Sequence, residues 1–169
     1  MHEGGADSVE PVATIRPAFA DDPVSAELIA ELDAELARAY QPADMHGLHP
    51  GEARNPALRF FLLELDGVPV GCGALRVLAP GVAELKRMFV RRPHRGRGLG
   101  RQLLRQLEQE AARGGIRLLR LETGPQQRVA IALYHAAGYC DIPPYGEYVG
   151  SRVSICMEKV LAERSDATG

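Results

Sequence analysis

The sequence predicts an α/β domain in which a mixed, mostly antiparallel sheet of six to seven strands carries helices on both faces. Apolar runs of strand length recur along the 169 residues, and two of them, residues 58–65 and 68–78, are separated only by the hairpin signal Asp66-Gly67. Segments of helical periodicity interrupt the other runs. Hairpins therefore alternate with crossovers, as in a mixed sheet covered on both sides.

The remaining elements follow from periodicity and turn residues. Residues 14–18 suit a short first strand, and residues 23–40 suit a helix because apolar side chains recur at every fourth position. Residues 41–56, which contain three prolines, are expected to form an irregular loop or a broken short helix. The rest of the chain predicts strands at 82–90, 116–123, 139–142 and 153–160 and helices at 99–113 and 126–137.

Composition indicates one domain, residues 13–161, between disordered tails at 1–12 and 162–169. A net charge of −2 argues against a nucleic-acid binder. No apolar run approaches the roughly 20 residues that cross a bilayer, and the start lacks a signal-peptide pattern. The three cysteines form no disulfide framework or metal motif, and His46, His49 and His94 lack metal spacing. We expect a cytoplasmic protein that binds neither membrane nor metal.

The most informative segment is basic and rich in glycine. Eight Lys or Arg residues and no acidic residue lie between Lys86 and Arg105, and Gly96, Gly98 and Gly100 precede a predicted helix. A helix N-terminus presents unpaired N–H groups and partial positive charge, and glycine lets an anion approach the backbone. The spacing matches neither a P-loop nor a dinucleotide fingerprint. The segment predicts a site for phosphate groups.

The residues Arg95, Gly98 and Gly100 fit the pattern Arg/Gln-x-x-Gly-x-Gly/Ala. The chain here resembles the GNAT superfamily of N-acetyltransferases. A second stretch, residues 130–139 with the sequence AIALYHAAGY, is similar to that family's Ala-x-x-Leu-Tyr-x-x-x-Gly-Phe/Tyr signature. The resemblance covers roughly residues 58–160 and implies acetyl-CoA as co-substrate, with direct transfer of the acetyl group to an amine.

The resemblance also implies roles for individual residues. Tyr134 matches the tyrosine that protonates the departing thiolate, although it could equally be a core residue. Gln127 stands where many members carry an asparagine that contacts the pantetheine. The backbone of residues 88–90 would contact the thioester and the pantetheine. The implied cofactor-binding residues are Met88, Phe89, Val90, Arg95, Gly96, Arg97, Gly98, Leu99, Gly100, Arg101 and Gln127.

An amine such as that of lysine has a pKa near 10.4 in water, so direct transfer needs a base for its proton. Glu84 is our candidate because it lies eleven residues before Arg95, on the strand that often carries the catalytic glutamate in this superfamily. Strand alternation would place Glu84, Lys86, Met88 and Val90 on one side. Glu84 could instead pair with Lys86 or Arg76, and Glu122 is then the alternative base.

The fold implied by the resemblance builds the acceptor pocket from residues 40–52 and 142–148, the latter stiffened by two prolines. Arg76, Lys86 and Arg87 could hold a carboxylate, which favours a small carboxylated amine, or could simply be surface or phosphate-binding charges. Two alternatives stay open: a protein lysine or N-terminal acetyltransferase, and a non-catalytic acyl-CoA-binding sensor. A homodimer through sheet edges or C-terminal strands is compatible with the resemblance.

Overall fold

The computed structural model describes residues 11–162, which form one seven-stranded sheet in the order β1-β2-β3-β4-β5-β7-β6. All neighbouring strands are antiparallel except β4 and β5, which run parallel. The strands are β1 (Ala13–Ala18), β2 (Leu58–Leu65), β3 (Val68–Ala79), β4 (Val82–Val90), β5 (Leu118–Thr123), β6 (Cys140–Ile142) and β7 (Ile155–Val160). The α-helices are α1 (Pro23–Leu36), α2 (Leu99–Arg113) and α3 (Arg128–Ala136).

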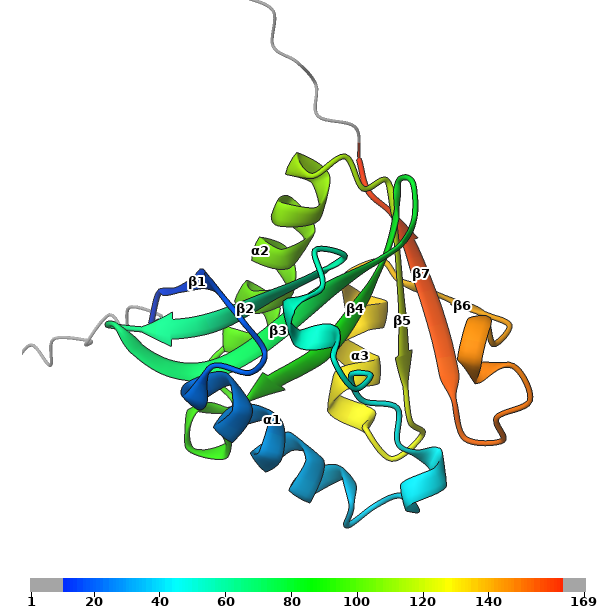
Figure 1. Cartoon of the computed structure of the whole chain (residues 1–169), viewed down its shortest axis with the longest axis horizontal. Coiled ribbons are helices and arrows are strands. Elements are labelled where there is room, and N and C mark those ends of the chain that lie inside the picture. The colour runs from blue at the N-terminus through cyan, green and yellow to red at the C-terminus, as the bar shows by residue number, and fades with distance from the viewer. Residues whose placement is uncertain (1–10, 163–169) are drawn as a thin grey trace, which may run out of the picture.

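Helices cover both faces of the sheet, as the sequence predicts (Figure 1). On one face, the apolar stripe of α2 packs with α3 residues against strand side chains such as Leu85 and Leu119. On the other face, Leu28 and Leu32 of α1 pack against Phe60, Leu62 and neighbouring strand residues. The sheet is therefore buried on both sides, which explains why its central strands read as continuous apolar runs.

The predicted hairpin between β2 and β3 is confirmed. Asp66 and Gly67 both have positive φ, 51° and 76°, as a two-residue turn of type I′ requires. The main difference lies in α1, which ends at Leu36 rather than at residue 40. Residues 37–40 continue only as turns, and the chain then enters the loop through Pro42, which cannot donate a helical hydrogen bond.

Two glutamines of α2 bond the outer edge of β1. The Gln102 amide accepts from the Ala13 N–H at 3.0 Å and donates to the Pro11 carbonyl at 2.8 Å. One turn further on, the Gln106 amide accepts from the Ile15 N–H at 3.0 Å and donates to the Ala13 carbonyl at 2.8 Å. These four hydrogen bonds satisfy backbone N–H and C=O groups on the side of β1 that has no neighbouring strand.

Replacing Gln102 and Gln106 together by alanine should lower the free energy of unfolding by about 2–4 kcal/mol. Each hydrogen bond contributes about 1 kcal/mol, and less where water reaches the exposed edge. Urea unfolding followed by circular dichroism measures the difference. Gln109→Ala is the matched control, because Gln109 is exposed on the same helix. An equal change in both variants would contradict the structural role of the pair.

The expected tails fall almost wholly outside the described residues. Residues 1–10 and 163–169 are not described, whereas Pro11 is placed and bonds Gln102. Among the helices of residues 11–162, none has the length and apolar character needed to cross a membrane.

Candidate functional site

The site is organised by the divergence of β4 and β5. Their parallel ladder comprises four pairs, from Val82–Leu118 to Leu85–Leu121, after which the two strands separate (Figure 1). The backbone of residues 86–90 therefore has no ladder partner on the β5 side, although β3 still pairs with it on the other. A strand with one free edge can pair with an extended ligand.

A β-bulge at Arg87 begins this separation and changes the direction of the following side chains. Ala74 pairs with Lys86 and Cys72 with Phe89, so two residues of β4 oppose one of β3, and Arg87 has a positive φ of 54°. Met88 and Val90 consequently pack with the α2 core, on the face opposite Glu84 and Lys86. The expectation that these four residues share one side is wrong, because it assumed unbroken alternation.

A cleft lies between the diverging strands and is covered by α1, the loop after it and α3. Its walls combine apolar side chains with a few polar ones. It is lined by Leu32, Leu36, Tyr40, Asp44, Met45, His46, Leu85, Lys86, Arg87, Met88, Glu122, Thr123, Gly124, Gln127, Ala130, Tyr134 and Val153. Both predicted acceptor segments lie around this site, since residues 40–46 line the cleft and residues 145–148 contact β4 beside it.

The glycine-rich segment forms the start of α2, as predicted. Gly96 and Gly98 both have a φ of 76°, and Gly98 is the N-cap of the helix. A Cβ built on Gly96 meets nothing within 4 Å, so the backbone is open there. The N–H groups of the first turn have no partner within the helix, and Arg97 and Arg101 are exposed beside them. The arrangement suits phosphate oxygens.

Arg95 makes contacts that the sequence did not indicate. Its guanidinium donates two hydrogen bonds to Glu35 of α1, at 2.7 and 2.6 Å, and one to the Val90 carbonyl at 2.8 Å. The Arg95 hydrogen bond keeps the pKa of the Glu35 carboxyl below its usual value. Arg95 thus ties the glycine-rich turn to α1. Glu35 carried no sequence signal for this role, because the pair spans 60 residues of chain.

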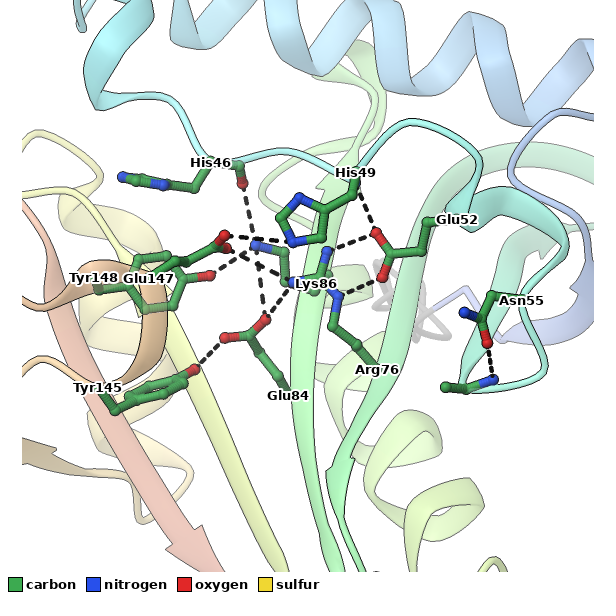
Figure 2. A network of polar contacts seen from close by, with 11 residues as sticks. His46, His49, Glu52, Asn55, Arg76, Glu84, Lys86, Tyr145, Glu147 and Tyr148 are labelled. Atoms are coloured by element: carbon green, nitrogen blue, oxygen red, sulfur yellow. Dashed lines mark hydrogen bonds and ion pairs between the residues drawn. The ribbon is translucent and has the colours of Figure 1, made fainter.

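Glu84 lies in a buried polar network beside the cleft (Figure 2). It is 2% exposed and accepts hydrogen bonds from Arg76 Nη1 at 3.0 Å and from the Tyr145 hydroxyl. Arg76 also bonds both carboxylate oxygens of Glu52. Glu84 is absent from the cleft lining, although it was our first candidate base. Its pairing with Arg76 matches the structural alternative that the sequence left open.

The same network joins two loops beside the cleft, the one after α1 that contains His46 and the one after β6 that contains Tyr148. Lys86 Nζ donates to the Tyr148 hydroxyl at 2.8 Å and to the His46 carbonyl at 3.1 Å, and burial lowers the pKa of its ammonium group. Figure 2 shows how these contacts bring residues from both loops together over β4. Arg87 pairs with Asp33 of α1. The three cations considered for a substrate carboxylate, Arg76, Lys86 and Arg87, therefore all have partners within the protein.

Glu122, the alternative base, lines the cleft near the end of β5. Burial raises the pKa of its carboxyl group, and the Ser154 hydroxyl donates a hydrogen bond to it at 2.9 Å. A carboxylate with a raised pKa that faces a cleft has the character of a general base. Ser154 carries no sequence signal for this contact, because its place beside Glu122 depends on the pairing of β5 with β7.

Tyr134 also lines the cleft and is 7% exposed. Its ring packs edge-on against Tyr139, with the ring centroids 5.8 Å apart. Burial raises the pKa of the Tyr134 hydroxyl, which therefore stays protonated at neutral pH. The side chain is thus a core residue that also lines the cleft.

Gln127 and Tyr40 close the end of the cleft at the β5–α3 turn. The Gln127 side-chain oxygen accepts from the Gly124 N–H at 3.1 Å and from the Thr123 hydroxyl at 3.2 Å, and Gln127 is the N-cap residue of α3. The Tyr40 hydroxyl accepts from the Gln126 N–H at 3.0 Å. The ring of Tyr40 lies directly on Gly124, in the space that a Cβ would need.

Gly124→Ala should therefore lower the free energy of unfolding by about 1–3 kcal/mol, the usual cost of overpacking a filled site. Thermal unfolding measures the loss. A Gly124→Ala/Tyr40→Ala double variant tests the cause, since removing the ring should make the added methyl group nearly neutral relative to Tyr40→Ala alone. Additive losses in the double variant would contradict the steric explanation.

Within residues 11–162 no group of three His, Cys, Asp or Glu side chains is placed to hold a metal ion. Cys72 and Cys156 are buried and Cys140 is exposed. Burial raises the pKa of the Cys72 thiol to about 12, and it raises that of Cys156 as well. Neither of these two thiols has the low pKa of a nucleophile.

Comparison with known proteins points to one family. Residues 22–139 match the family model described as the acetyltransferase (GNAT) family. A curated relative, the IAA acetyltransferase of Azospirillum brasilense, is 40% identical over 136 residues, which span 80% of this chain and 89% of the relative.

Solved structures agree. A crystal structure from Klebsiella pneumoniae, provisionally assigned as an acyl-CoA N-acyltransferase, is 33% identical with a TM-score of 0.78, covering 89% of this chain and 98% of its own. A GNAT family acetyltransferase from Elizabethkingia anophelis, solved with acetyl-CoA bound, shares the fold at 19% identity and a TM-score of 0.66, covering 88% and 98%.

Proposed function

Because the chain belongs to the GNAT family of acetyltransferases, we propose that it transfers an acetyl group from acetyl-CoA directly to a primary amine of a small metabolite. One observation carries this proposal. Glu122 and Tyr134 line one cleft, which opens where β4 and β5 diverge and lies beside the loops of His46 and Tyr148 that Lys86 bonds.

The residues present fit acetyl-CoA. The open backbone at Gly96 and Gly98, with Arg97 and Arg101 beside it, suits the pyrophosphate. The edge of residues 86–90 that has no strand partner on the β5 side suits the amide-bearing pantetheine, which can add to it like a strand. Arg95 would act by holding the glycine-rich turn against α1, because its guanidinium already bonds Glu35.

For the chemistry we place Glu122 first as the base. It would accept the proton of the incoming ammonium group, directly or through a water molecule, and its raised pKa brings it closer to neutral pH. Tyr134 would donate a proton to the departing thiolate of CoA and would regain one from the nitrogen that has received the acetyl group. Glu84 would instead fix Arg76 and the loop that contains Tyr145, on the side of the cleft where we place the acceptor. This assignment needs no covalent enzyme intermediate.

The acceptor class follows from the same contacts. Arg76, Lys86 and Arg87 each bond a partner within the protein, and these contacts compete with binding of a substrate carboxylate. We therefore keep the acceptor as a small primary amine and do not require a carboxylate. The buried links between the loops favour an enclosed acceptor over a long peptide.

The first experiment is titration calorimetry with acetyl-CoA, followed by a thiol assay for CoA release with a panel of small amines and lysine peptides. We expect micromolar binding and release with small amines. Intersecting initial-rate lines would support direct transfer, whereas parallel lines would contradict it. Release only with peptides would favour the protein acetyltransferase. Binding without release by any amine would favour the acyl-CoA sensor.

A further inference from the structure

Ser154 lies immediately before β7, beside the end of β5 that carries Glu122. The β5–β7 ladder pairs Glu122 with Cys156 and Thr123 with Ile155, so Ser154 sits next to the last pair. Its hydroxyl donates a hydrogen bond to the Glu122 carboxylate at 2.9 Å. Both side chains are half-buried, where a hydrogen bond to a charged oxygen is stronger than in water.

The position of Ser154 is itself fixed by a turn. The hydroxyl oxygen of Ser151 accepts hydrogen bonds from the N–H groups of Val153 and Ser154, at 3.3 and 3.1 Å. Val153 lines the cleft together with Glu122. The turn therefore presents the Ser154 hydroxyl to Glu122 from the wall of the same cleft.

We propose that Ser154 is a positioning residue that holds the Glu122 carboxylate ionised and oriented toward the acceptor amine, an inference that rests on the proposed function. A carboxylate uses one oxygen for the serine and keeps the other for the incoming proton. The hydroxyl favours the ionised form, because a bond from a donor stabilises charge on the acceptor.

Other groups around Glu122 also affect its titration. Burial and Glu84 raise the pKa of the Glu122 carboxyl, whereas Ser154, His46 and Lys86 lower it. Tyr148 and Cys156 also interact electrostatically with Glu122. Ser154 is the member of this set that bonds the carboxylate directly. Removing its hydroxyl should therefore raise the pKa of Glu122 without changing the net charge of the site.

The test compares Ser154→Ala, Ser154→Thr and Ser151→Ala. Carbon-13 NMR titration of the Glu122 carboxyl, assigned with Glu122→Gln, should give a pKa about one unit higher in Ser154→Ala, the scale of one lost bond to an ionised group. Ser154→Thr should restore the wild-type value because it keeps the hydroxyl. Ser151→Ala loosens the turn but keeps the Ser154 hydroxyl, so it should raise the pKa of Glu122 by less than Ser154→Ala does.

Activity supplies the second readout. In the pH profile of kcat/KM, the fall in activity at low pH reports protonation of the base. In Ser154→Ala this fall should move to higher pH by the same amount as the NMR pKa of Glu122. An unchanged NMR pKa in Ser154→Ala, or a larger shift in Ser151→Ala than in Ser154→Ala, would overturn the positioning role. A shifted NMR pKa with an unshifted kcat/KM profile would instead show that Glu122 is not the base. That outcome would contradict the proposed function, and with it the positioning role.

Discussion

Glu122→Gln is expected to reduce kcat/KM by about 10²–10⁴-fold, the usual contribution of a general base. The amide cannot accept the ammonium proton, yet it has the same shape and can still accept the Ser154 hydrogen bond. Binding of acetyl-CoA should stay within a few-fold of wild type. Steady-state thiol release and calorimetry measure the two quantities. The free energy of unfolding should not fall, because the substitution removes a half-buried charge whose desolvation is unfavourable.

Glu84→Gln provides the contrast between the two candidate bases. Glu84 is buried and pairs with Arg76, so its neutralisation should lower the free energy of unfolding by about 3 kcal/mol. The loss of turnover in the protein that remains folded should be much smaller than in Glu122→Gln. The reverse pattern, a stable Glu84→Gln protein without activity and an active Glu122→Gln protein, would assign the base to Glu84.

Gly98→Glu should weaken acetyl-CoA binding by at least about 100-fold. The new carboxylate would stand at the N-terminus of α2, where we place the pyrophosphate, and would replace attraction by repulsion. Titration calorimetry measures the change in Kd. The glutamate must also adopt the φ of 76° found at Gly98, which costs an L-residue about 1–2 kcal/mol.

Gly115→Glu separates these two effects. Gly115 has a φ of 81°, lies in open space and follows the opposite end of the same helix. Both variants should therefore lose similar stability, while Gly115→Glu should keep its affinity for acetyl-CoA. Equal loss of affinity in both would attribute the Gly98 result to general destabilisation and would contradict the phosphate site.

Much of the fold could be predicted because local signals agree with the tertiary structure. The strands at 58–65 and 82–90 and the helix at 99–113 have the predicted bounds, since each is set by a turn or a glycine next to a clear period. The shortened α1 could not be predicted. Tyr40 continues the four-residue period of apolar side chains, so the sequence extends the helix to it. In the structure Tyr40 lies beyond the end of α1, and its ring packs on Gly124.

The site was predictable where it depends on residues close together in the chain. The glycine-rich turn and its place at the start of α2 follow from residues close together in the chain. The bulge at Arg87 does not, because its β3 partner lies on another strand and no residue type marks it. The Arg95–Glu35 and Glu122–Ser154 contacts also depend on which strands and helices become neighbours, whereas the Glu84–Arg76 pair joins two nearby strands and was among the pairings that the sequence left open.

The two glutamines along β1 also affect how this chain can associate with other chains. An exposed strand edge is a template on which a second molecule can extend the sheet, either as a dimer or as an aggregate. Here an incoming strand would first have to displace Gln102 and Gln106 and break four existing hydrogen bonds. The opposite edge, β6, offers only three residues. Self-association of this protein is therefore expected to use helix or loop surfaces rather than a continuous intermolecular sheet.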